Sequence, residues 1–224
     1  MRKHYDVIIA TPGHSMHASY VDSLMRTVEM LNREGISFVL SNAYSSYVPH
    51  AREFTALGRG EHVWDSNEIY GGVSYNKIFW IDSDMGWDPE NFLKLYRSEL
   101  DIVSGIYATD QYGTVAVSYS DKKGRPTRVN KVEFLLHDKP VKVAGVGFGF
   151  VCVKAGVFEA IKRPWFSAES FELRDTLEEG QEQMVVNYGE DYSWCVKAQR
   201  AGYEIWVDPL VRVGHNKQII FRAD

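Results

Sequence analysis

The chain has 224 residues, 45% of them hydrophobic, and its 25 lysines and arginines are outnumbered by 30 aspartates and glutamates, for a net charge of −5. This length and apolar content suit one domain with a buried core, and the acidic balance excludes a general attraction to nucleic acid or anionic membranes. Cys152 and Cys195 lie in no metal-binding or disulfide motif, and no apolar run approaches the roughly 20 residues that cross a bilayer. We therefore expect a cytoplasmic protein without a membrane span.

The first half of the sequence alternates apolar runs with segments of helical periodicity. Gly35 stands where a helix would end, and Asp88 and Pro89 stand where another would begin, as N-cap and first helical residue. The alternation predicts an α/β fold with a mostly parallel central sheet and helices on both faces. Strands are predicted over residues 5–10, 36–40, 77–81 and 101–106, and helices over 18–34, 48–57 and 89–97.

The second half has shorter apolar runs joined by turns, which predicts a small antiparallel part. The acidic stretch 167–188 has no clear periodicity and is expected to be a mobile loop. With no internal repeat or linker, the chain should form a single domain over residues 1–224. Strands are predicted over residues 115–119, 129–136, 141–143, 203–207 and 210–213, and helices over 154–161 and 190–201.

The strongest chemical feature is Asp82-Ser83-Asp84, which directly follows the apolar run 77–81. Ligands of open α/β sheets bind at the carboxyl ends of strands, where this turn would lie. Two carboxylates on one short turn repel each other, and a divalent cation with phosphate oxygens would keep both ionised. The alternative is a solvated turn with no ligand.

Other motifs follow in a definite order along nearly the whole chain. They are residues 7–12 (VIIATP), 48–52 (VPHAR), 79–85 (FWIDSDM) with Pro89, 101–107 (DIVSGIY), 145–150 (GVGFGF), 189–195 (GEDYSWC) and 202–209 (GYEIWVDP) with 214–215 (GH). In this order they resemble the GT-A glycosyltransferases, in particular the small family-2-like enzymes of bacteria and phages. The resemblance implies a single Rossmann-like GT-A domain. Residues 1–110 would bind the nucleotide sugar, and residues 111–224 would bind the acceptor and carry the catalytic base.

The resemblance also implies a metal and a donor. Asp84 and His215 would ligate Mn²⁺ or Mg²⁺, although a lone histidine is more often a surface or capping residue. A nucleotide-diphosphate sugar, most naturally a UDP-sugar, would be the donor. Residues expected to contact it are Thr11, Pro12, Arg52, Asp82, Ser83 and Gly147. Glu53 stands after Arg52 where the family often has Asn, and the glycines near Gly147 could instead form a tight strand crossing.

Asp191 is the expected general base of an inverting transfer to an acceptor hydroxyl, with Glu190 as the alternative base or as an acceptor contact. Placed in the first turn of the 190–201 helix, Asp191 should be held ionised by the helix dipole. The same placement is also common for acidic residues that only stabilise a helix start.

The acceptor and the broader class leave alternatives open. A nucleotidyltransferase would normally carry a glycine-rich basic loop after the first strand, which residues 11–17 lack, and a non-catalytic sugar- or metal-binding domain is the third reading. The acceptor could be a glycan, a small molecule or, for a phage enzyme acting in its host's cytoplasm, a hydroxymethylated DNA base. A DNA acceptor would meet the basic run Lys122, Lys123, Arg125, Arg128 and Lys131, which is otherwise a solvated hairpin.

Overall fold

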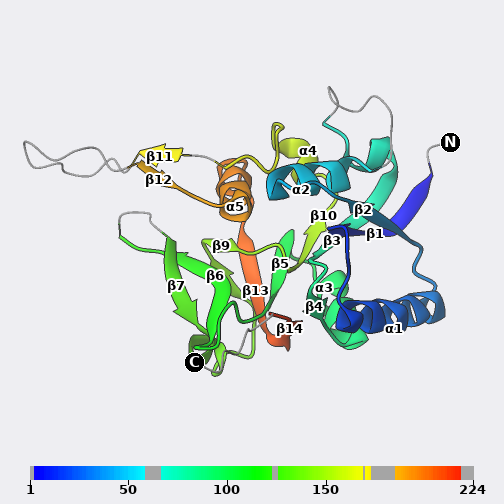
Figure 1. The fold of residues 1–224 in the computed structure, drawn as a ribbon, viewed down its shortest axis with the longest axis horizontal. Coiled ribbons are helices and arrows are strands. Elements are labelled where there is room, and N and C mark those ends of the chain that lie inside the picture. Colours follow the sequence, from blue (N-terminus) through cyan, green and yellow to red (C-terminus); the bar gives the residue numbers. More distant parts are fainter. Residues whose placement is uncertain (1–2, 59–66, 123–125, 169, 173–184, 218–224) are drawn as a thin grey trace, which may run out of the picture.

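A sheet in the order β2-β1-β3-β10-β5-β13-β8 runs through the middle of the computed structural model, which describes residues 3–58, 67–122, 126–168, 170–172 and 185–217 (Figure 1). Neighbouring strands are parallel except for β10 and β8, which are antiparallel to their partners. The α/β class and the mostly parallel sheet are confirmed. The strands are β1 (His4–Pro12), β2 (Phe38–Ala43), β3 (Ser74–Ile81), β5 (Ile102–Ile106), β8 (Val141–Val143), β10 (Phe150–Lys154) and β13 (Ile205–Arg212).

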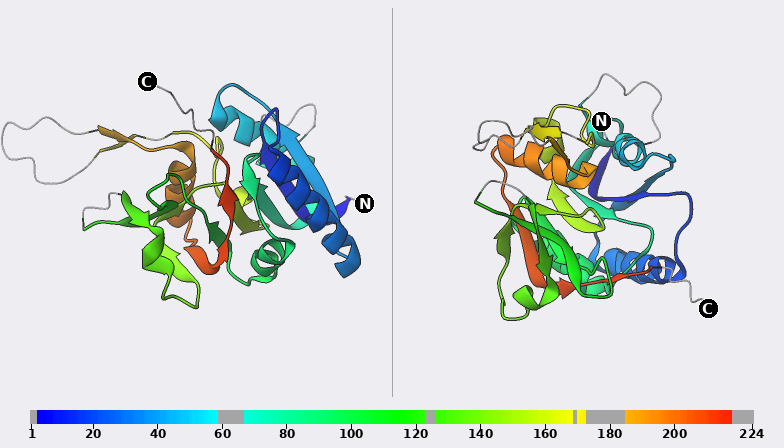
Figure 2. Two further views of the ribbon diagram at one scale, coloured as in Figure 1. Left: turned by 60° about the horizontal axis from the view of Figure 1, so that its bottom comes forward. Right: turned by 60° about the vertical axis from the view of Figure 1, so that its left-hand side comes forward.

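Alternate residues of the central strands enter two separate apolar cores, because successive side chains of a strand point to opposite faces. Ile78 and Trp80 of β3 pack towards α2, α4 and α5, whereas Phe79 and Ile81 pack towards α1 and α3. Figures 1 and 2 show these two helical layers on either side of the sheet. The helices are α1 (Ala18–Glu34), α2 (Val48–Leu57), α3 (Pro89–Arg97), α4 (Val157–Ala160) and α5 (Glu190–Arg200). In the part of the chain that the structure describes, no helix has the length and apolarity needed to span a membrane.

The predicted helix ends are mostly correct. α1 and α2 have the expected limits, and Gly35 takes the left-handed conformation (φ 70°) that ends α1. α3 begins after Asp88, but the Asp88 side chain does not cap the helix. It accepts a hydrogen bond from Arg26 Nη2 at 3.2 Å instead.

Three small antiparallel sheets complete the fold. β6, β7 and β9 form one beside the carboxyl end of the central sheet, β4 and β14 pair in another, and β11 pairs with β12 (Figure 1). Their limits are β4 (Met85–Gly86), β6 (Thr114–Ser120), β7 (Pro126–Asn130), β9 (Gly145–Val146), β11 (Ser170–Glu172), β12 (Val185–Asn187) and β14 (Gly214–His215), and 3₁₀ turns cover η1 (Ile69–Gly72) and η2 (Lys131–Phe134).

Several predicted elements of the second half were wrong. The strand expected over 129–136 ends at Asn130, because Asn130 Oδ1 accepts a hydrogen bond from the Val132 amide and Glu133 Oε1 accepts one from the Asn130 amide, which starts η2. The expected strands 203–207 and 210–213 are one irregular strand, β13. The predicted loop 167–188 contains β11 and β12, and its residues 169 and 173–184 lie outside the described part.

The largest omission is β10, in the centre of the sheet. Its sequence, FVCVK, is a short apolar run buried on both faces, and such a run carries no periodicity that distinguishes it from a loop or helix. The helix predicted over 154–161 therefore overlaps the end of β10, and only the second part of that range is helical, as α4.

Candidate active site

The carboxyl ends of β1 and β3 open into a cleft of about 640 Å³, called the main cleft here. α5 contributes to its wall from one side and the chain after β13 from the other. Most of the predicted site residues meet here, although they come from segments far apart in the sequence. The lining residues are Pro12, Gly13, Tyr44, Ser45, Ser46, Val48, Ala51, Arg52, Asp82, Ser83, Asp84, Tyr107, Thr109, Ala116, Asp191, His215 and Lys217.

Asp84 and His215 come together because β4 pairs with β14, which places His215 opposite Met85. Asp84 Oδ2 lies 3.2 Å from His215 Nε2, and His215 Nδ1 is 2.9 Å from the Ala108 carbonyl oxygen. The hydrogen bond to Asp84 raises the pKa of His215. Partial burial opposes ionisation of Asp84, but the contacts with His215 and Lys217 hold its pKa below the usual value.

The donor atoms of this pair fit a divalent cation that is shared with a ligand. A hydrogen bond from Nδ1 to Ala108 leaves the Nε2 lone pair of a neutral His215 directed at Asp84, so one imidazole nitrogen and one carboxylate face the same point. Within the described residues, no group of three or more His, Cys, Asp or Glu side chains could hold a metal. Diphosphate oxygens or water would have to complete the coordination shell.

Arg52 forms a buried ion-pair cluster at the floor of the main cleft. Its Nη2 donates to Asp82 Oδ2 at 3.2 Å, its Nη1 lies 3.0 Å from Asp82 Oδ1 outside hydrogen-bond geometry, and its Nε donates to Glu190 Oε1 at 3.2 Å. Burial works against the charge, yet Asp82 and Glu190 raise the pKa of Arg52 above its usual value. The guanidinium also stacks 5.5 Å from the centre of the Phe148 ring. Arg52 therefore orients two carboxylates here, while its Nη1 makes no hydrogen bond within the described residues, and its contact with a donor stays a prediction.

Asp191 occupies the first turn of α5 and lines the main cleft. Its pKa is raised by burial and by the neighbouring charge of Glu190, which together outweigh the opposing effect of Arg52. The backbone amide of Tyr192 at the helix start does favour the ionised form, as expected, but burial and Glu190 outweigh it, so Asp191 is not held ionised as predicted. Glu190 is already paired with Arg52. Of the two neighbouring carboxylates, Glu190 and Asp191, it is therefore Asp191 that lines the main cleft.

Two of the predicted donor contacts, Thr11 and Gly147, do not line the main cleft. The Thr11 side chain is fully buried and hydrogen-bonds the Tyr20 hydroxyl, so it does not reach the cleft. A Cβ on Gly147 would lie 2.3 Å from the Tyr107 hydroxyl, so glycine is needed there for tight packing. Tyr107 in turn lines the main cleft and accepts a hydrogen bond from the Gly149 amide at 3.0 Å.

A second cleft, of about 410 Å³, lies over the β6-β7-β9 sheet and is called the sheet cleft here. It shares Thr109, Ala116 and Asp191 with the main cleft, so Asp191 stands where the two meet. Arg128, from the predicted basic run, also lines it. Lys123 and Arg125 of that run lie outside the described residues, and the structure gives no support to a DNA partner.

Lys217, Asn216 and the role of Glu53 were not predicted. Lys217 contacts Asp84 Oδ2 at 3.2 Å, and Asn216 donates to the Asp84 carbonyl oxygen. The position of Lys217, two residues after His215, was the only available signal. Glu53 is buried in α2, where Oε1 accepts from Arg163 Nε at 2.7 Å and Oε2 accepts from the Trp165 amide at 3.1 Å.

We predict that Glu53→Ala lowers the free energy of unfolding by about 3 kcal/mol, because it leaves the mostly buried Arg163 guanidinium without this carboxylate. Urea unfolding would measure the change. Glu29→Ala is the matched control, since Glu29 forms an exposed i,i+4 pair with Arg33 and should change stability by about 0.5 kcal/mol or less. Equal effects of the two substitutions would contradict the assigned role of Glu53.

The fold class that these elements define is that of the GT-A glycosyltransferases. A structure of GalNAc-T7 with UDP, GalNAc and Mn²⁺ matches 98% of this chain and 44% of that chain, with a TM-score of 0.57 and 9% sequence identity. Protein A197 from STIV matches over 100% and 98% of the two chains with a TM-score of 0.49 and 17% identity. The catalytic domain of Drosophila β1,4-galactosyltransferase 7 in complex with xylobiose matches over 93% and 65%, with a TM-score of 0.46 and 14% identity.

The similarity to GalNAc-T7 establishes the fold alone. The chain spans less than half of the GalNAc-T7 chain and 65% of the Drosophila chain. No protein-family model matches the sequence, and no curated protein matches it.

Proposed function

We propose that the protein is a metal-dependent glycosyltransferase that transfers a sugar from a nucleotide-diphosphate sugar to an acceptor hydroxyl, with inversion at the anomeric carbon. The observation that carries the proposal is the convergence of Asp84, His215 and Asp191 on the main cleft. A carboxylate with a raised pKa in the same cleft as Asp84 and His215 is typical of a catalytic site, which favours an enzyme over a non-catalytic domain.

The side chains that meet in the main cleft would each have a part in the reaction. Asp84 and His215 would hold Mn²⁺ or Mg²⁺, which when bound supplies a Lewis acid for the departing diphosphate. Asp82, fixed by Arg52, would face the ribose or the donor sugar. Asp191 would accept the proton of the acceptor hydroxyl as the new glycosidic bond forms, and the nucleoside diphosphate would leave.

The acceptor would enter through the sheet cleft. Asp191 is shared by both clefts, so a hydroxyl held over β6 and β9 could approach a donor sugar held in the main cleft. Ser118, Thr127 and Tyr192, which carry hydroxyl groups, are among the residues that line the sheet cleft, and such groups suit a sugar or another polyhydroxylated acceptor. Trp87, Trp165 and Trp194 are buried in the cores and cannot stack on it.

A thermal-shift panel of UDP, GDP, dTDP and CDP, with and without Mn²⁺, tests the proposal. UDP with Mn²⁺ comes first, because GalNAc-T7, of the same fold, binds that pair. At a hundredfold excess over the dissociation constant the ligand should add about 2.7 kcal/mol of apparent stability. The metal-dependent part should disappear in Asp84→Ala and persist in Asp22→Ala, an exposed aspartate of α1. If none of the four nucleotides shifts the wild type, donor binding is refuted.

A further inference from the structure

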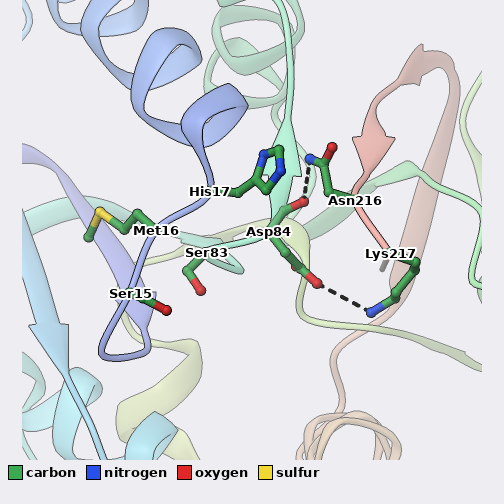
Figure 3. Close-up of a pocket in the computed structure, with 7 residues that line it drawn as sticks. All are labelled: Ser15, Met16, His17, Ser83, Asp84, Asn216 and Lys217. Atoms are coloured by element: carbon green, nitrogen blue, oxygen red, sulfur yellow. Dashed lines mark hydrogen bonds and ion pairs between the residues drawn. The ribbon is translucent and has the colours of Figure 1, made fainter. Parts of the chain in front are cut away.

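Lys217 lines the main cleft and lies beside Asp84, the proposed metal ligand. It follows β14, whose pairing with β4 carries the chain back past Asp84. Asn216 holds this segment in place, since its amide and its Nδ2 donate to the Asp84 carbonyl oxygen at 2.9 and 2.8 Å, and Nδ2 also donates to Ser19 Oγ at 2.7 Å. Figure 3 shows the Lys217 side chain directed at the Asp84 carboxylate. The backbone before Lys217 is therefore held beside Asp84 by the fold.

Lys217 faces two cavities at once. It lines the main cleft and also a cleft of about 550 Å³ on the other side of Asp84, the outer cleft, which is formed with Ser15, Met16, His17, Ser83 and Asn216 (Figure 3). The side chain is 54% exposed, and its one ion pair with a described residue is with Asp84 Oδ2. An ammonium group has three hydrogen-bond donors, so Lys217 can bind an incoming anion whether it keeps or breaks its ion pair with Asp84.

The other cations of the main cleft are already engaged. Among the described residues that line it, the basic side chains are Arg52, His215 and Lys217. Arg52 is buried between Asp82 and Glu190, and His215 is held between Asp84 and the Ala108 carbonyl. A diphosphate brings negative charge that needs positive partners in a cleft lined by three aspartates, Asp82, Asp84 and Asp191. Lys217 is the basic side chain of this lining that is exposed enough to meet it.

We propose that Lys217 binds the diphosphate of the donor and supplies nucleotide affinity that does not require the metal. The inference rests on the proposed function. With a metal ion bound at Asp84, the ammonium group would be free of that carboxylate and could contact the phosphate oxygens. Lys217 thereby limits how strongly donor binding depends on the metal.

Calorimetric titration with UDP, in Mn²⁺ and separately in EDTA, tests the role of Lys217. In EDTA, Lys217→Met should bind UDP about tenfold more weakly than the wild type, because it lacks one charge-assisted contact. Lys217→Arg should recover most of the affinity. The matched control is Lys142→Met on β8. This substitution removes an exposed ion pair with Glu204, and the variant should bind UDP as the wild type does. Pyrophosphate in EDTA is a second probe that does not depend on the nucleobase.

The outcomes distinguish a failure of the Lys217 assignment from a failure of the proposed function. If the wild type binds UDP in Mn²⁺ but Lys217→Met matches it for both probes in EDTA, the assignment of Lys217 is overturned and the proposed function stands. If pyrophosphate binds in a Lys217-dependent way but UDP does not bind at all, the lysine assignment holds and the UDP donor is wrong. If the wild type binds neither probe in EDTA, the metal-independent affinity does not exist and the inference fails.

Discussion

Asp191→Asn is expected to lower kcat for sugar transfer by about 10²–10⁴-fold while leaving nucleotide binding nearly unchanged. Asparagine keeps the shape of the side chain and an oxygen that can accept the Tyr192 amide hydrogen bond, as Asp191 Oδ1 does at 2.7 Å. It cannot accept the proton of the acceptor hydroxyl. Steady-state kinetics with the donor found by the nucleotide panel would measure the loss. A variant that retains more than half of the wild-type kcat would remove Asp191 from the role of base.

The raised pKa of Asp191 gives this prediction a pH signature. The base must be ionised, so activity should fall as the pH drops through a pKa that lies above the usual range for aspartate. The charge of Glu190 contributes to that shift, so Glu190→Gln should move the acid limb of kcat/KM to lower pH. A limb that does not move, or that moves to higher pH, would contradict the assigned coupling between the two carboxylates.

The same shift predicts that the base costs stability. The pKa of Asp191 is higher in the folded than in the unfolded protein, so the folded state loses stability as the pH rises from the unfolded pKa through the folded one. Asp191→Asn removes this loss and should unfold at the same temperature as the wild type or a higher one near neutral pH. A carboxylate kept for function at the expense of stability would behave in this way.

The sequence predicted those parts of the fold whose signals are local. α1 and α2 were found at their observed limits because apolar periodicity and end residues such as Gly35 act within a few positions. β10 was missed because its place in the sheet is set by pairing with β3 and β5, which are far away in the sequence. The ion pairs of Glu53 likewise depend on residues more than a hundred positions away.

The candidate site was predicted in composition more than in arrangement. The Asp-x-Asp turn and the Glu-Asp pair are short motifs, so Asp84 and Asp191 could be named from the chain alone. Whether a buried arginine meets phosphate or a carboxylate depends on which side chains fold against it. Arg52 was expected at the donor, and its ion pairs with Asp82 and Glu190 could not be read from the sequence. Lys217 belongs to no motif, and only the pairing of β4 with β14 brings it to Asp84.

Arg52→Met is expected to lower the free energy of unfolding by about 3 kcal/mol. The Arg52 side chain is 6% exposed, and its removal leaves Asp82, Glu190 and Asp191 close together without the cation that offsets their repulsion. In a chain of this size the loss corresponds to a fall in Tm of roughly 6–12 °C. Arg52→Lys should recover only part of it, because a lysine cannot hold both carboxylates in one planar fork.

Arg26→Met is the control for this prediction, because Arg26 also contacts two carboxylates, Asp22 and Asp88, but on the exposed surface of α1. Surface pairs of this kind contribute about 0–1 kcal/mol, so the control should stay close to the wild type in urea unfolding. Adding Glu190→Gln to Arg52→Met should restore part of the stability, since one of the unpaired charges disappears. If Arg52→Met is no less stable than Arg26→Met, or if the second substitution makes it worse, the cluster does not depend on charge compensation and Arg52 is free to serve the donor instead.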